Sequence, residues 1–404
     1  MEEKEEKFDI AVVGGGPAGL SAAYAAAKSG AKVVLFEKDQ SIAHNVRTSG
    51  VTWISEMERL GIPSKLYNPI QNYRFVSPSN DVLITGDISK SCVLDIRAMY
   101  QHLAVLAAKE GVQLKVKSNV TDVITDGHRV VGVKASTPEG MLIVGSTLVI
   151  DASGFSTFVG RKARVASNWK RYGVGAEYEC YCDDIDSTTW VLMVGQKYSD
   201  AGYGWVFPLS PNRVRIGVGI GRPESNADPL EKLHKLIEKR FKPLDAIGDG
   251  KIQPLELHYG FIPNEGIRRN SIADGLIMVG DSAGQSNPLV LEGIRYAIDF
   301  GRLAGKVGAD SLSHNSDRES LLEYERSWKT KVESKIQSAL KVQTHWLGLT
   351  DEEWDKEIEI LRNMTVQEFL DFIKADFTKV NMMKLAVHHP KMAARQLFSM
   401  LLRS

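Results

Sequence analysis

A glycine-rich turn near the N-terminus carries the strongest chemical signal in the sequence. It reads Gly14-Gly15-Gly16-Pro17-Ala18-Gly19 and stands between a short apolar run, residues 8–13, and an alanine-rich run that ends at Gly30. Gly14 permits a tight turn, Gly16 lets the backbone approach a pyrophosphate, and Gly19 allows a helix to pack closely on the strand. The free N–H groups and partial positive charge of a helix N-terminus attract phosphate. These residues, with Pro17 and Ala18, predict a dinucleotide site.

An acidic residue stands where a dinucleotide site needs one. Residues 31–37 predict a second strand, and Glu37 at its end is 18 residues beyond Gly19. At this distance a carboxylate accepts hydrogen bonds from the ribose hydroxyls. We assign Glu37 and the adjacent Lys38 to the same site. The glycine pattern alone could be a simple turn, but strand, turn, helix, strand and acid in register favour a dinucleotide.

A second motif far downstream identifies the dinucleotide as FAD. Gly280-Asp281-Ser282-Ala283-Gly284 follows a predicted buried strand, residues 275–279, and precedes a predicted long helix, residues 289–307. We expect Asp281 and Gly284 at the cofactor, with the Asp281 carboxylate bonded to the ribityl chain of the flavin. The backbone N–H groups near Gly293 and Ile294 would meet the N1/C2 edge, where a donor-rich helix end stabilises the negative charge of reduced flavin.

An aromatic segment, Tyr203-Gly204-Trp205-Val206-Phe207-Pro208, could form the wall of an apolar site. Apolar ligands need aromatic walls with few polar groups. The alternative is that Tyr203, Trp205 and Phe207 are core aromatics, since their spacing puts them on one face of a strand. The sequence alone leaves both interpretations open.

These motifs together resemble the geranylgeranyl reductase family of flavoproteins, within a larger group that includes aromatic hydroxylases and flavin halogenases. The resemblance runs from Phe8 to about Gly308 and also includes Arg97 and Asp151-Ala152-Ser153-Gly154. It implies that Arg97 contacts FAD and that Val120 lies against the adenine end. The aromatic segment resembles the Tyr-x-Trp-x-Phe-Pro signature of the reductases, which implies that Tyr203, Trp205, Phe207 and Pro208 line a lipid cavity.

One segment departs from the family pattern. Reductases of this family often have Arg-Cys-Gly after the second strand, with the cysteine near the flavin. Here the segment is Val46-Arg47-Thr48-Ser49-Gly50. We still assign Arg47, Thr48, Ser49 and Gly50 to the cofactor site, because Thr48 can form hydrogen bonds although it lacks a thiol.

The resemblance implies an FAD-dependent reductase of isolated C=C bonds in the isoprenoid chains of a prenyl lipid. The olefin must be protonated as reduced flavin supplies a hydride, and the sequence names no acid, so no catalytic residue is predicted. An aromatic monooxygenase or halogenase is one alternative, although the Trp-x-Trp-x-Ile-Pro segment of halogenases is missing. A non-catalytic FAD-containing protein that binds prenyl lipids is another.

The electron donor is expected to be external. No second Gly-x-Gly-x-x-Gly turn stands between a strand and a helix, since Gly217, Gly219 and Gly221 lie in a strand pattern. A reduced ferredoxin-like protein, or a nicotinamide or deazaflavin that visits the flavin, would therefore supply electrons.

Composition excludes other classes of function. Fifty basic and fifty acidic residues cancel, so no nucleic-acid partner is expected. Three cysteines are too few for a disulfide framework or a four-ligand cluster, and no metal is predicted. Reduced thiols of a cytoplasmic protein are the favoured interpretation, with a redox pair at Cys180 and Cys182 as the alternative. His44 and His102 are expected in a solvated loop and on a helix surface.

The end of the chain is basic. After Asp376 only positive charges occur, and residues 381–402 combine them with apolar residues. We expect this tail either to pack on its own domain or to contact an anionic membrane surface as a peripheral protein at the cytoplasmic face. No apolar run approaches the roughly 18 residues of a membrane span.

The elements that must position these residues predict an α/β fold. It comprises a Rossmann-like FAD-binding domain, an inserted antiparallel β-sheet substrate domain and a C-terminal helical region. We expect the FAD-binding domain at 1–165, with substrate-layer elements near 65–90, and again at 266–310. The substrate domain is expected at 166–265 and the helical region at 311–404. Within these regions, the patterns predict helices at 94–110 and 229–241. They predict strands at 112–117, 120–125, 130–135 and 142–150 and over 172–221. From residue 318 onward they predict helix, with breaks near Gly348 and Pro390.

Overall fold

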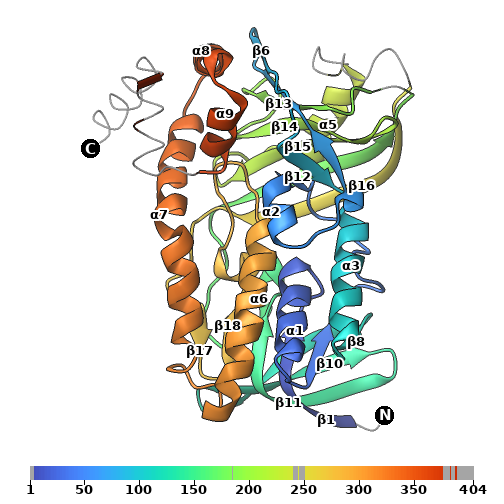
Figure 1. Cartoon of the computed structure of the whole chain (residues 1–404), viewed down its shortest axis with the longest axis vertical. Coiled ribbons are helices and arrows are strands. Elements are labelled where there is room, and N and C mark those ends of the chain that lie inside the picture. Colours follow the sequence, from blue (N-terminus) through green and yellow to red (C-terminus); the bar gives the residue numbers. More distant parts are fainter. Residues whose placement is uncertain are drawn as a thin grey trace.

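Two large sheets lie along the long axis of the molecule, one toward each end, with helices packed along their sides (Figure 1). The computed structural model describes residues 4–183, 185–239, 244, 251–375, 383, 387 and 388. The mixed α/β class is as predicted.

The first sheet is largely parallel. Its order is β17-β18-β11-β1-β2-β8, and β9 and β10 extend it as a hairpin on β11. Strand β1 pairs in parallel with both β2 and β11. The strand, helix and strand predicted around the glycine-rich turn are confirmed as a βαβ unit, and β9 and β10 pair as an antiparallel hairpin. The bounds are β1 Lys4–Val13, β2 Val33–Phe36, β8 Gln113–Lys115, β9 Asn119–Asp126, β10 Arg129–Thr137, β11 Gly140–Asp151, β17 Ile272–Ala273 and β18 Leu276–Met278.

Three helices cover this sheet: α1 (Pro17–Lys28), α3 (Ile96–Lys109) and α6 (Ile294–Asp310). Helices α1 and α6 pack at very close range, because a Cβ added at Gly305 would lie 2.1 Å from the backbone oxygen of Ala22. Helix α3 begins later than predicted, since the Asp95 side chain accepts a hydrogen bond from Ala98 N at 3.0 Å and caps the helix.

The predicted start of α6 at residue 289 is wrong. Residues 289–293 form an irregular segment in which Leu291 has φ 51°. Local hydrogen bonds shape this segment: Asn287 N donates to Glu292 O at 2.8 Å, and Leu289 N donates to Asn287 Oδ1 at 3.0 Å. The apolar residues of the segment therefore line space between the elements instead of continuing the helix.

The second sheet is mostly antiparallel and has the order β16-β12-β15-β14-β13-β5-β6. Strands β5 and β6 come from the region near residues 65–90, and β5 pairs in parallel with β13. Helix α5 (Pro229–Glu238) packs on one face of this sheet. Strand β16 was not predicted. The bounds are β5 Asn72–Val76, β6 Asp81–Ile84, β12 Tyr172–Tyr181, β13 Thr189–Val194, β14 Gly202–Ser210, β15 Arg213–Arg222 and β16 Gln253–Pro263.

A small third sheet joins the two larger ones. It consists of β3 (Val51–Trp53), β7 (Ser91–Leu94) and β4 (Tyr67–Ile70), and the short helix α2 (Ile54–Arg59) follows β3. Strand β4 lies in the region near residues 65–90 where further elements were expected, whereas β3, α2 and β7 were not predicted. Arg215 of β15 fixes this junction, since its Nη1 donates to Ser49 O at 2.8 Å and to Leu94 O at 2.9 Å.

The C-terminal helices α7 (Leu322–Trp346), α8 (Asp351–Glu359) and α9 (Val366–Ile373) close the second sheet on its inner face. The predicted break near Gly348 is present, because Thr350 forms a capping box with Glu353 and starts α8. Phe369 of α9 packs its ring 5.3 Å from Tyr73 and 5.1 Å from Phe75. The expected break near Pro390 and nearly all of the basic tail lie outside the described residues.

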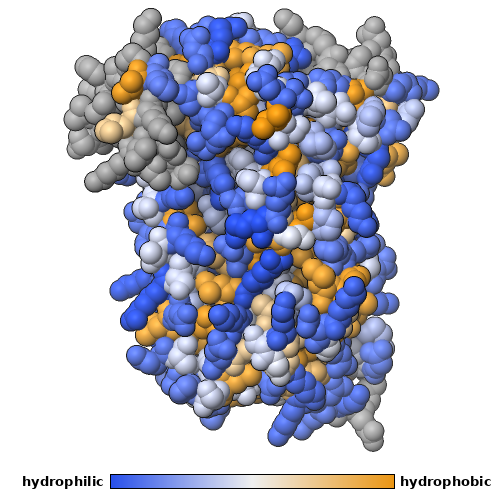
Figure 2. All heavy atoms as spheres, viewed as in Figure 1, coloured by the Kyte–Doolittle hydropathy of each residue, from blue (hydrophilic) through white to orange (hydrophobic). Residues whose placement is uncertain are grey.

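Polar side chains cover most of the face in Figure 2, and smaller apolar patches lie between them along the length of the molecule. No helix in the described part of the chain is long and apolar enough to cross a membrane.

Candidate functional site

A cavity of about 890 Å³ lies between the two large sheets and holds most of the predicted cofactor residues. Its walls come from the turn after β1, the end of β2, the segment before β3, strand β9, the turn after β11 and the start of α6. The second sheet supplies the opposite wall. The predicted residues that line this cofactor cavity are Gly14, Gly16, Pro17, Ala18, Glu37, Lys38, Arg47, Thr48, Ser49, Val120, Asp281, Gly293 and Ile294.

The glycine-rich turn has the shape that a pyrophosphate needs. A Cβ at Gly16 would meet nothing within 4 Å, so this residue faces open cavity. A Cβ at Gly14 would lie 2.3 Å from Ala152 O, and one at Gly19 would lie 1.9 Å from Gly14 O. Gly14 and Gly19 are therefore required by the fold, whereas Gly16 leaves room for a ligand at the N-terminus of α1.

The Glu37 carboxylate reaches this turn from the end of β2. Its Oε2 accepts a hydrogen bond from Gly15 N at 2.8 Å, and its Oε1 accepts one from Asp39 N at 2.8 Å. Glu37 thus braces the turn from the cavity wall. Its predicted bond to ribose hydroxyls stays a prediction.

Asp281 also lies in the wall of the cofactor cavity. Burial raises the pKa of its carboxyl to about 7. The segment that carries Asp281 is held by Asp151, whose Oδ1 accepts from Ser153 Oγ at 2.6 Å and from Ser282 Oγ at 3.3 Å. This contact explains why the Asp151-Ala152-Ser153-Gly154 segment accompanies the Gly280 segment in the sequence.

Four predicted cofactor residues lie outside the cavity lining: Gly19, Gly50, Gly284 and Arg97. Backbone conformation or close backbone packing requires each of the three glycines. Gly50 has φ 81°, a Cβ at Gly284 would lie 2.3 Å from Gly266 O, and one at Gly19 would meet Gly14 O. Arg97 donates to Glu256 of β16 and pairs with it. The FAD contact that the family resemblance implies for Arg97 stays a prediction.

Trp205 lies flat across the glycines of the second sheet. A Cβ at Gly217 would lie 2.2 Å from the Trp205 ring, and one at Gly219 would lie 3.3 Å from it. In the strand register, Trp205 of β14 pairs with Gly217 of β15, and Gly217 pairs on its other side with Glu177 of β12. The glycines at 217 and 219 therefore serve to seat the indole, whose Nε1 donates to Glu177 Oε2 at 2.7 Å.

The row of residues that runs across β14, β15 and β12 continues to His258 on β16 and forms a buried network of ionisable side chains. The sequence analysis did not predict this network. His258 of β16 is opposite Glu177, and its Nδ1 lies 2.8 Å from Glu177 Oε1. Both side chains are buried and both line the cofactor cavity. Next to them Arg215 lies 3.2 Å from Glu179. Burial raises the pKa of Glu179, but the hydrogen bond from Arg213 and the charge of Arg215 outweigh it and lower this pKa overall.

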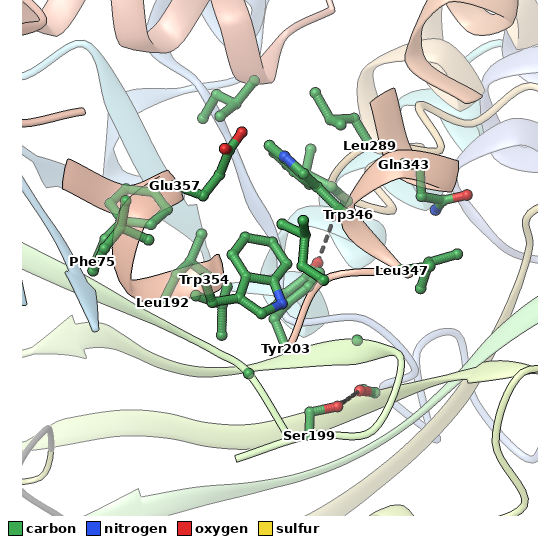
Figure 3. Close-up of a pocket in the computed structure, with 18 of the residues that line it drawn as sticks. Phe75, Leu192, Ser199, Tyr203, Leu289, Gln343, Trp346, Leu347, Trp354 and Glu357 are labelled. Atoms are coloured by element: carbon green, nitrogen blue, oxygen red, sulfur yellow. Dashed lines mark hydrogen bonds between the residues drawn. The ribbon is translucent and has the colours of Figure 1, made fainter. Parts of the chain in front are cut away.

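A second, narrower cavity of about 140 Å³ lies between the second sheet and the C-terminal helices. Figure 3 shows Trp346 and Trp354 close to Tyr203, with Leu192 and Phe75 on the sheet side. The two indole rings lie 5.7 Å apart. Apart from a few groups such as Gln343, Glu357 and Ser199, the lining is apolar. We call this the apolar cavity.

Three residues line both cavities: Tyr203 of β14, Gly219 of β15 and Leu291 of the irregular segment before α6. The Tyr203 hydroxyl donates to Val290 O at 2.7 Å, which ties this segment to the sheet. The cofactor cavity and the apolar cavity are therefore neighbours across a wall of three residues.

The predicted substrate residues divide at this wall. Tyr203 lines both cavities and Trp205 lines the cofactor cavity, but Phe207 and Pro208 line neither. Phe207 is 3% exposed and its ring lies 5.3 Å from that of Trp190. The lipid contact expected for Phe207 and Pro208 stays a prediction, since neither residue is in the lining of either cavity.

The cysteines and histidines for which no role was favoured line neither cavity. Cys180 and Cys182 are buried thiols in the core under α5, and burial raises their pKa to about 12 and about 11. His44 and His102 line neither cavity. Among the residues that the structure describes, no group of His, Cys, Asp and Glu could hold a metal ion.

The comparisons with known proteins agree with this geometry. Residues 9–247 match the family described as FAD dependent oxidoreductase, so the site is that of an oxidoreductase whose cofactor is FAD. Digeranylgeranylglycerophospholipid reductase 1 of Methanococcoides burtonii is 31% identical to this chain and the match covers 92% of each protein. The chain belongs to the family of these reductases.

Solved structures share the fold. A geranylgeranyl bacteriochlorophyll reductase-like protein from Thermoplasma acidophilum has a TM-score of 0.85 at 24% identity, covering 98% of this chain and 99% of that one. The flavin-dependent brominase Bmp2 has a TM-score of 0.67 at 19% identity, covering 97% and 99%. At these identities the likeness concerns the fold.

Proposed function

We propose that this enzyme reduces isolated C=C bonds in the geranylgeranyl chains of a prenylated glycerophospholipid. The observation that carries this proposal is the apolar cavity, which adjoins the cofactor cavity at Tyr203, Gly219 and Leu291. An isoprenoid chain has no polar group to bind, so an apolar, aromatic lining suits it. The name of the Methanococcoides burtonii relative supports the same substrate class.

The chain's own residues would hold FAD by the predicted contacts. The N-terminus of α1 at Gly16, Pro17 and Ala18 would bind the pyrophosphate, and Asp281 would accept from the ribityl chain. Reduced FAD supplies a hydride when bound. The protein would position the olefin against Trp205 and Tyr203 and would keep water away from it, which suppresses competing reactions.

The electrons and the lipid would both reach the two cavities from outside. We infer that electrons arrive from an external donor, either a reduced ferredoxin-like protein or a nicotinamide or deazaflavin. We also infer peripheral contact with the cytoplasmic face of a membrane, because the lipid substrate must leave a bilayer to enter the apolar cavity.

A turnover assay tests the proposal directly. Holoenzyme reduced with dithionite under anaerobic conditions is mixed with digeranylgeranyl glycerophospholipid in detergent micelles, and the lipid is analysed by mass spectrometry. We expect a gain of two hydrogens for each bond reduced and no gain with oxidised enzyme. An unchanged lipid would indicate a non-catalytic lipid-binding protein. A halogenated or oxygenated product under oxygen and halide would indicate the halogenase or monooxygenase alternative.

A matched pair of variants locates the site of this activity. Leu347→Trp narrows the apolar cavity from a half-buried position (Figure 3), so lipid reduction should slow at least tenfold while FAD content stays normal. Leu312→Trp places the same ring at a half-buried position that lines neither cavity. Equal rates of lipid reduction in the two variants would show that the apolar cavity does not bind the lipid.

A further inference from the structure

We propose that His258, oriented by Glu177, donates the proton that completes reduction of the double bond. This inference rests on the proposed function and assigns its missing acid. An isolated olefin carries no group that stabilises an added hydride, so a proton must reach the neighbouring carbon in the same event. The acid must therefore lie in the cofactor cavity, away from bulk water.

His258 has the geometry of a positioned acid. Its side chain is 3% exposed and lines the cofactor cavity, and its Nδ1 bonds to Glu177 Oε1 at 2.8 Å. Its Nε2 is buried and forms no hydrogen bond among the described residues. The Glu177 carboxylate thus fixes the ring through Nδ1, and Nε2 is the ring atom left to meet a ligand.

Glu177 also connects His258 to the aromatic residues Trp205 and Tyr203. Its second oxygen accepts from Trp205 Nε1 at 2.7 Å, and Trp205 contacts Tyr203 with ring centroids 5.8 Å apart. One carboxylate therefore orients both the imidazole and the aromatic surface that leads to the apolar cavity. Glu177 is a positioning residue in this scheme.

The other proton carriers near the wall fit less well. The Tyr203 hydroxyl already donates to Val290 O, and burial raises the pKa of this phenol, so it holds its proton. Asp281 lies with the Gly280 segment, where the ribityl chain of FAD is expected. Glu357 lies on α8 at the apolar cavity, on the far side of the wall from the cofactor cavity.

A path for the next proton leads to solvent. Glu256 Oε2 lies 3.5 Å from His258 Nε2, and the Glu256 side chain is 38% exposed. After each turnover Glu256 can return a proton from water to His258. Among the described residues, the charged groups that face this region are Glu177, Glu179, Glu256, Asp95, Arg97, Arg213 and Arg215.

The atoms and electrons balance in one step. Reduced FAD, when bound, would supply the hydride with its electron pair for a C–H bond at one olefinic carbon. The N–H bond of His258 would break, and its proton would form a C–H bond at the other carbon with the π electron pair. The olefin would be reduced by the two electrons that reduced FAD gives up, and His258 would be left neutral. The external reductant, dithionite in the assay, restores reduced FAD.

The test compares single turnovers of reduced holoenzyme with the prenyl lipid. His258→Gln keeps the side chain polar but removes the acid, and we expect a rate at least 100-fold lower, within the range of about 10²–10⁴ for general acid catalysis. Glu177→Gln should lower the rate about tenfold or more. His234→Gln is the matched control, since His234 bonds to Tyr178 at 3.1 Å from α5, outside both cavities, and its rate should equal that of the wild type.

Two readouts do not depend on lipid turnover. Oxidation of the reduced holoenzymes by ferricyanide, which needs no proton on carbon, should be equal in all variants. In ¹⁵N-histidine NMR of the wild-type holoenzyme, the His258 signal is the one that is lost in His258→Gln. Its titration midpoint should equal the midpoint of the pH–rate profile of lipid reduction. The rate should fall as pH rises, because His258 loses its proton.

The outcomes separate the two proposals. Lipid reduction by His258→Gln within threefold of the wild type would overturn the proton assignment and leave the proposed function standing. No lipid reduction by the wild type would overturn both. If the variants lose FAD, the NMR titration of the wild-type holoenzyme decides the question. A midpoint for the His258 signal that differs from the midpoint of the pH–rate profile of lipid reduction would reject the assignment.

Discussion

Gly16 and Gly19 belong to one motif, yet they should respond to substitution in different ways. A side chain at Gly16 enters open cavity, whereas one at Gly19 meets the backbone of Gly14. We expect Gly16→Val to fold normally and to purify without FAD, because its side chain fills the pyrophosphate position. Gly19→Val should destabilise the whole protein. Flavin absorption and thermal unfolding measure the two effects, and a yellow, FAD-loaded Gly16→Val would contradict the assignment of this turn.

Asp281 should make FAD affinity depend on pH. Burial raises the pKa of this carboxyl to about 7 in the protein without FAD. Hydroxyl groups of the ribityl chain that donate to the carboxylate would lower that pKa, so FAD binding would release a proton below about pH 7. FAD affinity should therefore rise from about pH 5 to pH 7, by at most tenfold per unit, and then level off.

Asp281→Asn provides the comparison, because an amide does not titrate. Its FAD affinity should be lower than that of the wild type at pH 7 and should lack this pH dependence. Fluorescence titration of the apoprotein with FAD across this range measures both. Parallel curves for the two proteins would place the titrating group elsewhere.

Only part of the site could be predicted at the level of residues. The glycine turn, Glu37 and Asp281 could be placed because each motif is local in sequence. Phe207 and Trp205 could not be distinguished, since both point to the same face of β14. Their environments differ only through Gly217 and Gly219 on the neighbouring strand, and single-strand periodicity does not contain this information.

At the scale of elements, the contact between α1 and α6 should control the cofactor site. Both helix N-termini line the cofactor cavity, and Gly305 meets Ala22 at the shared surface. Gly305→Val should push the helices apart at a cost of about 1–3 kcal/mol and should weaken FAD binding at least tenfold. Lys306→Val makes the same β-branched change on the exposed side of α6 and should bind FAD normally. Equal FAD affinity in the two variants would show that the helix contact does not position the cofactor.

The missed strand β16 shows why long-range elements escape a sequence analysis. Its apolar residues Leu255, Leu257, Tyr259 and Phe261 are 42–59% exposed, whereas the buried side carries His258. The usual alternation is inverted at this edge strand, so the pattern gave no buried face to detect. Glu177 and His258 are 81 residues apart, and only the strand register brings them together.

At the scale of the whole molecule, the basic tail should decide membrane attachment. Five positive charges follow Asp376, at Lys379, Lys384, Lys391, Arg395 and Arg403. At about 1 kcal/mol per basic residue near an anionic bilayer, they could produce reversible binding that salt weakens. We expect full-length protein to sediment with anionic liposomes at low salt, and a truncation after Asp376 to stay in the supernatant. The full-length chain with these five residues changed to Gln is the control for charge, and sedimentation equal to wild type would assign the tail to packing.

The pairing of α1 with α6 also sets an order of events during synthesis. Helix α1 ends at Lys28 and its partner starts at Ile294, so the ribosome adds more than 260 residues between them. At about 5–20 residues per second this takes on the order of ten seconds to a minute. Throughout that time the alanine face of α1 has no partner, and half of the FAD cradle has not been made. FAD therefore cannot guide early folding of the nascent chain. Its uptake belongs to the last stage of synthesis, after the chain has already built the sheet that will cover the flavin.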